Sequence, residues 1–377
     1  MTVGTDVVGH EPMSGSGREA DSGSSPGGDS VPEADSGHAA RGLCVSPPNP
    51  PTMAPAEDDI SIEEKRVYAG SAGRTDAYVA TGSGVVRVAL SADKIGAFDM
   101  VARDAAHDVA VLPRADAPDL LGVATDEGLL VAPVGDDLAF EAIAGVLAGD
   151  DVVDGDAADD DPGDRSPVVA VGAHDDAFLV AGTGGRIDRV TIDGSGTGGD
   201  AAALDATAIR VGEVEAPRAI DGPLVAAADG IHRIVERDEA GGGHELAAAG
   251  LDDAADVAGA GTPLAATGTG LYWLGNGWMS VREGSGEAVA ADGDGHAMAV
   301  VDGELFVHDG DAAGWGSASW STTTLPVAER AVALGYGPGT AVVVTDAGTL
   351  CVDAGDGWRH QVVGVRDVTG VALAVVE

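Results

Sequence analysis

The stretch Ala77-Tyr-Val-Ala-Thr-Gly-Ser-Gly-Val-Val-Arg-Val-Ala89 consists of two short apolar runs joined by a small polar turn. Short Val-rich runs are typical of β-strands, and a turn with Gly and Thr or Asp connects the strands of a tight hairpin. The same pattern recurs six more times, in residues 121–132, 177–190, 223–235, 263–274, 297–307 and 341–352. The sequence therefore predicts seven β-hairpins.

The spacing of the hairpins indicates how they assemble. The turn glycines are Gly84, Gly128, Gly184, Gly230, Gly270, Gly303 and Gly348. Their six intervals are 44, 56, 46, 40, 33 and 45 residues, with a mean of 44, which is the length of one four-stranded propeller blade. The longest interval contains the acidic stretch 149–164, which we interpret as a surface loop, and the shortest requires short connections. We therefore predict an all-β, seven-bladed β-propeller over residues 60–377, with six or eight blades as alternatives.

Further strand positions recur around the hairpins. A short run of small apolar residues, suited to a crowded innermost strand, precedes six of them, in residues 107–111, 167–171, 217–220, 255–258, 287–290 and 330–334. A Gly-Trp pair follows three hairpins, and we expect its indole to fill the wedge between blades, at Trp278, Trp315 and Trp358. A last inner-type run, residues 366–376, should pair with the blade begun by residues 65–68 and close the ring.

The first 59 residues differ in composition from the rest of the chain. They consist mainly of Gly, Ser, Pro, Asp and Glu with scattered Ala, and they show no strand or helix periodicity. Such a segment cannot bury enough apolar surface to offset the entropy of ordering, so we expect residues 1–59 to be a disordered acidic tail. Met53 lies just before the change in composition, and an alternative interpretation is that translation begins there.

The charge balance of the chain indicates the salt concentration in which it folds and the partners that it is not expected to bind. The chain has 63 acidic and 20 basic residues, a net charge of −43 and a pI near 4.1, and only two of the basic residues are lysines. Nucleic acids and anionic membranes require a basic surface, so neither is an expected partner. Acidic self-repulsion on this scale destabilises a compact chain unless salt screens it, and at 1 M salt the screening length is about 3 Å. We therefore expect a protein of a salt-rich cytoplasm.

Three further stretches are informative: Ser61-Ile-Glu-Glu-Lys-Arg-Val-Tyr68, Leu224-Val-Ala-Ala-Ala-Asp-Gly-Ile-His232, and residues 262–278, which read Thr-Pro-Leu-Ala-Ala-Thr-Gly-Thr-Gly-Leu-Tyr-Trp-Leu-Gly-Asn-Gly-Trp. They resemble a haloarchaeal β-propeller family that has no assigned activity. The resemblance covers residues 60–377 and implies the propeller fold and the high-salt habitat. It implies no catalytic residues.

The common catalytic and cofactor motifs are missing or incomplete. Neither lysine follows a Gly-rich phosphate-binding loop, and no Gly-x-Ser-x-Gly sequence occurs. His244-Glu begins like a zinc-protease helix but lacks its second His, and the acidic stretch 149–164 lacks the ligand spacing of a calcium-binding EF-hand. The sequence therefore predicts no cofactor and no metal.

Charged residues mark the starts of the predicted inner strands. In a propeller these starts meet around one mouth of the central channel, where opposed arginines and carboxylates would bind a small anion or metabolite and orient it. The candidate ligand-binding residues are His107, Asp108, Arg218, Asp256, Arg330, Arg366 and Asp367. The alternative is a ring of mutual salt bridges that closes the channel rim.

The sequence favours a non-catalytic scaffold that presents one propeller face to a protein or small ligand. The alternative is a propeller hydrolase or lyase with a metal or an Arg/His/Asp site at the channel mouth. The enzyme hypothesis predicts convergent, desolvated His and carboxylate groups without neutralising partners. The scaffold hypothesis predicts a plugged or small-residue-lined channel and an apolar surface patch.

Lowering the salt concentration from molar to tens of millimolar should unfold the protein, because the repulsion among its carboxylates is then no longer screened. The measurement is the melting temperature, followed by circular dichroism across a KCl series. A melting temperature that does not change with salt would contradict the electrostatic explanation.

Overall fold

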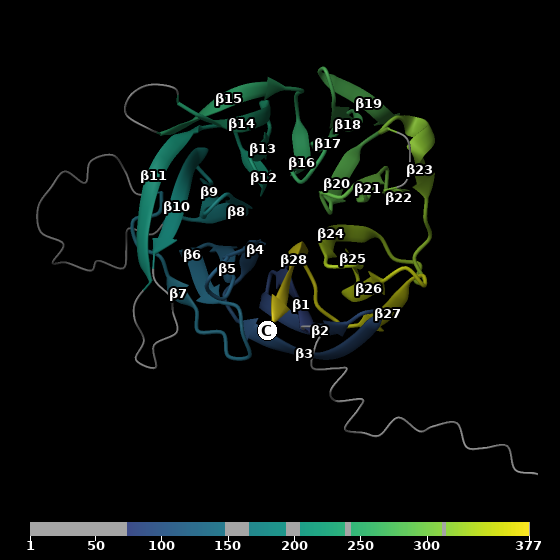
Figure 1. The fold of residues 1–377 in the computed structure, drawn as a ribbon, viewed down its shortest axis with the longest axis horizontal. Helices are drawn as coiled ribbons and strands as arrows, with labels where there is room; N and C mark the ends of the chain where they lie inside the picture. Colours follow the sequence, from purple (N-terminus) through teal and green to yellow (C-terminus); the bar gives the residue numbers. More distant parts are fainter. Residues whose placement is uncertain (1–73, 148–165, 194–203, 238–242, 311–313, 377) are drawn as a thin grey trace, which may run out of the picture. The chain divides into compact units, whose positions relative to one another are not determined.

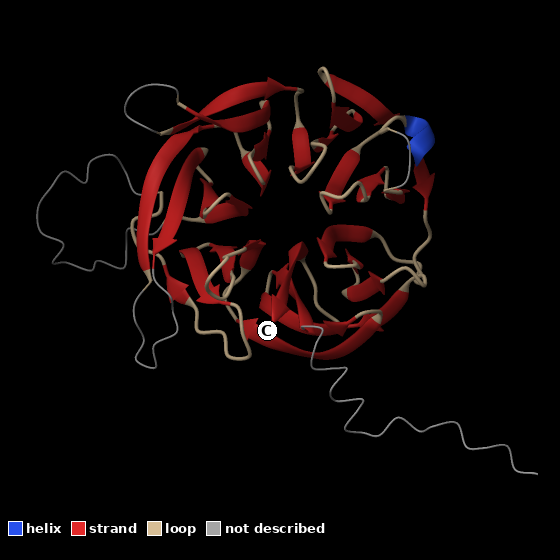
Figure 2. Ribbon diagram, viewed as in Figure 1, coloured by secondary structure: helices blue, strands red, loops and turns tan. Residues whose placement is uncertain are grey.

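Short strands separated by Gly-containing turns build the whole regular part of this chain. The computed structural model describes residues 74–147, 166–193, 204–237, 243–310 and 314–376, and every regular element in them is a strand apart from one 3-10 turn (Figure 2). The 28 strands form seven four-stranded antiparallel sheets around a central axis (Figure 1). The prediction of a seven-bladed β-propeller is therefore confirmed. The predicted tail, with Met53, lies outside the described residues.

The first three blades follow the chain from near its described start, and each is given from its innermost to its outermost strand. The first blade contains β28 (Val368–Val376), β1 (Arg74–Thr81), β2 (Gly84–Ser91) and β3 (Lys94–Ala102). The second contains β4 (Ala106–Leu112), β5 (Leu120–Thr125), β6 (Gly128–Pro133) and β7 (Glu141–Ala142). The third contains β8 (Val168–His174), β9 (Ala177–Gly182), β10 (Arg186–Asp193) and β11 (Asp205–Glu213).

The remaining four blades have the same order. The fourth contains β12 (Pro217–Asp221), β13 (Leu224–Ala227), β14 (Gly230–Glu236) and β15 (His244–Gly250), and the fifth β16 (Ala254–Ala258), β17 (Leu264–Thr267), β18 (Gly270–Leu274) and β19 (Trp278–Glu283). The sixth contains β20 (Gly286–Ala291), β21 (Ala297–Val301), β22 (Glu304–His308) and β23 (Trp320–Thr322), preceded by the 3-10 turn η1 (Ser317–Ser319). The seventh contains β24 (Ala331–Gly337), β25 (Thr340–Thr345), β26 (Thr349–Asp353) and β27 (Arg359–Val362).

The central hairpin of each blade has the turn chemistry that the sequence indicated. In the first hairpin the Thr81 hydroxyl donates to the Gly84 carbonyl oxygen at 2.8 Å, and Gly84 has a φ of 126°. A Cβ on Gly84 would lie 2.1 Å from the Ala102 carbonyl oxygen, so no larger residue fits there. The prediction was wrong by one residue in the third hairpin, where Gly185 and not Gly184 has the positive φ of 93°.

Strands from the two ends of the described chain close the ring. β28 pairs antiparallel with β1, with Leu373 opposite Ala77 and Val371 opposite Val79. The C-terminal strand thus completes the first blade as its innermost strand, which confirms the predicted closure (Figure 1). The predicted partner segment 65–68 lies outside the described residues, and β1 provides the pairing instead.

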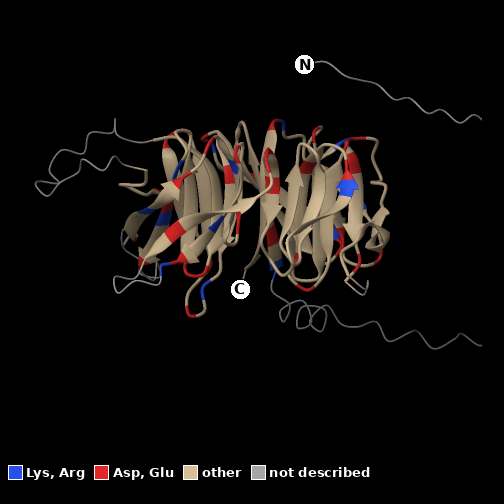
Figure 3. Ribbon diagram, turned by 90° about the horizontal axis from the view of Figure 1, so that it is seen from above, with Lys and Arg blue, Asp and Glu red and all other residues tan. Residues whose placement is uncertain are grey.

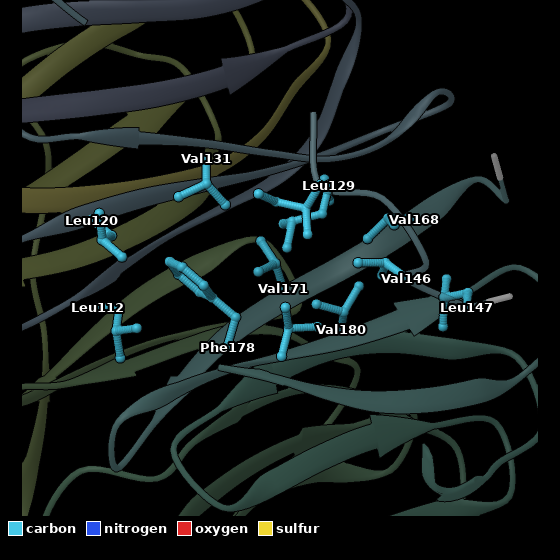
Figure 4. Close-up of a cluster of buried hydrophobic side chains, with 13 residues drawn as sticks. Leu112, Leu120, Leu129, Val131, Val146, Leu147, Val168, Val171, Phe178 and Val180 are labelled. Atoms are coloured by element: carbon cyan, nitrogen blue, oxygen red, sulfur yellow. The ribbon is translucent and has the colours of Figure 1, made fainter. Parts of the chain in front are cut away.

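The hydrophobic core is divided into clusters between neighbouring blades. Figure 4 shows the cluster between the second and third blades, where Phe178 lies among Leu112, Leu120 and Val171. The Phe178 side chain is fully buried, and its ring lies against Gly122, where an added Cβ would be only 2.7 Å from the ring. The absence of a side chain at Gly122 therefore makes room for the largest residue of this cluster.

The Gly-Trp residues pack between blades, as predicted. The indole nitrogen of Trp278 donates to the Ala249 carbonyl oxygen of the preceding blade at 2.8 Å, and that of Trp358 reaches the Thr323 hydroxyl at 3.4 Å. Trp315 stacks on the His308 ring with centroids 4.0 Å apart, and it precedes η1 and does not begin the outer strand.

Phe178→Ala should lower the free energy of unfolding by about 3–5 kcal/mol, because the substitution leaves a cavity in a fully packed cluster. The measurement is chemical denaturation at constant molar salt. The matched control, Ile209→Ala on the exposed outer strand β11, should change the free energy by about 0.5 kcal/mol or less. Equal effects of the two substitutions would contradict this assignment of the core.

Candidate functional site

A central channel runs between the innermost strands of all seven blades. It encloses a cavity of about 400 Å³, lined by residues of β4, β8, β12, β16, β20, β24 and β28. Most of the lining residues are Val, Ala or Gly. The ionisable exceptions include Asp108, Asp221, Asp256 and Glu287, so the channel carries carboxyl groups at a few fixed positions among small side chains.

Every inner strand carries a β-bulge at the same place near its start. The pairing with the second strand skips one residue in each blade, and a bulge turns a side chain out of the regular alternation. The skipped residues are His107, Val169, Arg218, Ala255, Glu287, Val332 and Thr369. All but Val169 line the channel, so the bulges form a ring of side chains around one of its mouths.

The predicted site residues occupy three different positions relative to this ring. His107 and Arg218 are bulge residues, and Asp108 and Asp256 directly follow a bulge. Arg330 directly precedes β24, and the pair at 366–367 precedes β28. The sequence suggested that these residues occupy equivalent positions in the repeat, but the structure shows that they do not. Side chains from the three positions have different surroundings.

Two of the predicted residues connect neighbouring blades. In Asp108, Oδ1 accepts a hydrogen bond from Val109 N at 2.8 Å and Oδ2 accepts one from Val171 N of the third blade at 3.0 Å. Asp256 repeats the arrangement with the amides of Val257 and Val289, both at 2.8 Å. Each carboxyl group therefore satisfies two backbone amides and joins two inner strands.

The surroundings of these carboxyl groups change their acidity. Burial deep in the channel raises the pKa of Asp108 and of Asp256 to about 7, and the two amide hydrogen bonds to each carboxylate oppose part of this rise. The charge of Asp221 raises both values further, and Asp221 itself has a pKa raised by burial. The channel therefore holds carboxyl groups that gain and lose protons near neutral pH.

The basic residues of the mouth are paired with carboxylates. His107 Nε2 lies 2.8 Å from Asp126 Oδ1, in the hairpin turn of the same blade. Arg218 Nη1 donates to Asp253 Oδ1 at 2.7 Å and to the Ala254 carbonyl oxygen at 2.9 Å, and both acceptors belong to the fifth blade or its entry. These contacts fix the orientation of the two side chains.

Arg330 makes a similar connection on the opposite side of the ring. Its Nη1 donates to Glu287 Oε2 of the sixth blade at 3.0 Å, while Glu287 Oε1 accepts from Gly303 N at 2.9 Å. The Arg330 backbone amide donates to Asp346 Oδ1 at 3.2 Å. The rim thus contains separate salt bridges within and between blades.

Arg366 and Asp367 are not among the residues that line the channel. Arg366 lines a separate groove between the first and seventh blades. The Asp367 carbonyl oxygen accepts from Gly82 N at 3.0 Å. The structure therefore brings together five of the seven predicted residues, in and around the channel.

Comparison with known proteins places the chain in a family. The sequence profile described as HVO_0234-like beta propeller matches residues 61–374, which is most of the chain. The chain belongs to this family. No curated protein matches it.

Several solved structures are similar to this HVO_0234-like propeller at low sequence identity. YCF48 bound to D1 peptide is 14% identical, with 80% of this chain and 97% of that one covered and a TM-score of 0.46. A chain of the nidogen/laminin complex is 8% identical, with coverages of 80% and 99% and a TM-score of 0.46. Apo AztD from Citrobacter koseri is 15% identical, with coverages of 79% and 83% and a TM-score of 0.40. At these identities the similarity concerns the fold alone.

The surface of the HVO_0234-like propeller is acidic. Figure 3 shows Asp and Glu over the loops at both ends of the blades, with fewer Lys and Arg among them. Within the described ranges, no helix has the length and apolarity needed to cross a membrane, and no cluster of three His, Cys, Asp or Glu side chains is arranged to hold a metal ion.

Sequence reasoning missed several residues of the mouth and channel. Glu287 begins one of the inner runs, at the same place in its run as His107, and that equivalence was the available signal. Asp126 and Asp253 are partners from turns and connections, which no strand pattern identifies. Asp221 ends β12, where its Oδ2 accepts from Gly259 N of the next blade at 2.6 Å.

The two channel carboxyl groups should make stability depend on pH. Between the ordinary carboxyl value of 3.8 and about pH 7, the folded chain keeps protons on Asp108 and Asp256 that the unfolded chain has lost. The contribution of these groups to the free energy of unfolding therefore falls as the pH rises through this window. Chemical denaturation at molar salt from pH 4 to 8 measures the effect.

Asp108→Asn and Asp256→Asn should each reduce this pH dependence, since an amide does not titrate. Each should also lose one amide hydrogen bond, at a cost of about 1–3 kcal/mol at low pH. The control is Asp104→Asn in the exposed connection between β3 and β4, which should keep the wild-type slope. A wild-type slope in both channel variants would contradict the raised pKa values.

Proposed function

We propose that this propeller is a non-catalytic scaffold that presents its channel-mouth face to a protein or small ligand in a salt-rich cytoplasm. The observation that carries the proposal is the paired state of the mouth. His107, Arg218 and Arg330 are each held by a carboxylate at 2.7–3.0 Å. A surface whose charges are already fixed loses little side-chain entropy when it binds.

The channel carboxyl groups support a structural role rather than a catalytic one. Both oxygens of Asp108 and of Asp256 accept hydrogen bonds from backbone amides of two blades. A general base must reach the proton that it removes, and these oxygens are directed at the backbone. Most of the channel lining consists of small residues, which supports the scaffold hypothesis.

The charge of the chain supports the proposed setting. A net charge of −43 is a source of strong self-repulsion, which molar salt screens. The haloarchaeal source of the protein is proposed on the same ground.

A second candidate function is hydrolysis or elimination at the channel mouth. It is favoured by the pKa of about 7 of Asp108 and Asp256, because a carboxyl group that titrates near neutral pH suits general acid–base catalysis. A panel of p-nitrophenyl esters, phosphates and glycosides separates the two functions. If the protein is a scaffold, the wild-type chain should hydrolyse none of these substrates faster than the Asp108→Asn variant does. Turnover by the wild-type chain that this substitution abolishes would establish the enzyme.

Arg330→Ala should impair binding much more than stability. The ion pair with Glu287 is partly exposed, at 54% and 30% for the two side chains, so its loss should cost about 1 kcal/mol or less. The measurement is affinity purification of tagged protein from a halophilic host at molar salt, with mass spectrometry of the bound proteins and small molecules.

The matched control for this prediction is Arg237→Ala. Arg237 forms an ion pair of similar length and exposure with Glu245, 3.1 Å apart, at the far end of the β14–β15 hairpin. A binding partner of the mouth should be lost from Arg330→Ala and retained by Arg237→Ala. Retention by both, or equal losses of stability and binding, would favour a purely structural rim.

A further inference from the structure

Neighbouring blades diverge toward the perimeter, and an apolar side chain packs into the resulting wedge at each of the seven interfaces within the described chain. In order from the interface of the first and second blades, the first six of these side chains are Phe140, Leu147, Leu246, Trp278, Trp320 and Trp358. At the interface of the seventh and first blades the corresponding side chain is Ile95 of β3, which is only partly buried. This interface contains a groove of about 480 Å³.

Two large apolar side chains in this groove are exposed to solvent. Phe98 and Met100 of β3 are 42% and 44% exposed, although both line the groove. In the strand register they lie opposite Val88 and Val86, which are buried against the seventh blade. Phe98 and Met100 therefore lie on the face of β3 that is turned toward the seventh blade, where they cover only part of the groove.

The seventh blade forms the other wall of the groove. Val363 and Val365 line it after the end of β27, and Val362 beside them is 63% exposed. A contiguous, exposed apolar surface of this kind is typical of a binding site, whereas single exposed apolar residues are not.

The strand beside the groove also has a free edge. β3 is nine residues long and is the outermost strand of its blade, so it pairs with β2 on one side only. Six of its residues are exposed, and it contains no Pro. The pairing of β3 with β2 shifts register at Val101 and again at residues 96–97, and the regular stretch between these shifts, residues 98–100, lines the groove. An exposed edge next to an apolar groove can accept a short added strand.

The charged groups of the groove indicate what such a strand would carry. Asp99 is already paired with Arg87, with Nη2 and Oδ2 3.3 Å apart. Arg366 lines the groove and is exposed, and in the described part of the chain it makes no ion pair. A basic group available beside an apolar groove is complementary to an acidic residue flanked by apolar ones.

We propose that the groove between the first and seventh blades binds an extended, acidic and apolar segment of a partner protein. The segment pairs with the free edge of β3, places alternate apolar side chains beside Phe98 and Met100, and directs a carboxylate at Arg366. This surface lies on the side of the ring, so the proposal does not depend on the function of the channel mouth.

The test uses a fluorescein-labelled peptide, Glu-Val-Thr-Ile-Ser-Val, and its Gln-Val-Thr-Ile-Ser-Val counterpart, in anisotropy titrations with the full chain at molar salt. The acidic peptide should bind, and Phe98→Asp and Met100→Asp should each weaken it about tenfold or more. Arg366→Ala should lower the affinity for the acidic peptide to that for the Gln peptide. It should leave the affinity for the Gln peptide unchanged. The same affinity for both peptides would overturn the role of Arg366.

Two controls keep the result interpretable. Ile209→Asp replaces a 59% exposed residue on β11, the other nine-residue outer strand, and should leave peptide binding unchanged. Unchanged melting temperatures would show that the groove variants are folded, and hydrogen exchange with the peptide bound should slow the amides of β3 selectively. Absence of binding, or equal weakening by Ile209→Asp, would overturn the proposal.

Two other occupants are distinguished in the same series. A benzophenone amino acid at position 100 should cross-link to the added peptide. Cross-linking to residues 1–73 of the same chain would overturn the proposal in favour of a segment of the protein itself. A dimer in analytical ultracentrifugation that Phe98→Asp converts to monomer would overturn it in favour of a second copy.

Discussion

The pairing of β28 with β1 is the interaction on which the rest of this structure depends. Seven sheets can pack face to face around an axis only if the last blade meets the first, and the register of Leu373 with Ala77 makes that meeting specific. Closure brings seven inner strands into one small circle. The bulges, the channel carboxyl groups and the ion pairs of the mouth are all consequences of placing distant segments in that circle.

The channel shows how an acidic chain uses carboxylates in two opposite environments. On the surface they are hydrated, and their number is limited mainly by their mutual repulsion. In the channel, Asp108 and Asp256 are partly buried, and backbone amides replace part of the lost hydration. Carboxylates therefore keep the surface hydrated, and in the channel they join neighbouring inner strands through hydrogen bonds. The backbone geometry decides which of the two roles a carboxylate has.

The fold was predictable from the sequence because its signals are local. A Thr three residues before a positive-φ Gly identifies a hairpin wherever it occurs, and in Thr81 and Thr125 the hydroxyl makes the expected bond to the glycine carbonyl. The site was predictable only in part. The bulge that separates the roles of His107 and Asp108 depends on the pairing of two strands, and the partners Asp126 and Asp253 come from connections without a pattern.

The closing strands have a consequence for folding, since β1 and β28 are separated by nearly the whole described chain. Bringing them together has a large loop entropy cost, and pairings so distant in sequence make folding slow. Until that step the chain is an arc with two unpaired ends, and these ends are the places where it would associate wrongly with other molecules. The pairing of β28 with β1 inside the first blade is therefore expected to form late in folding.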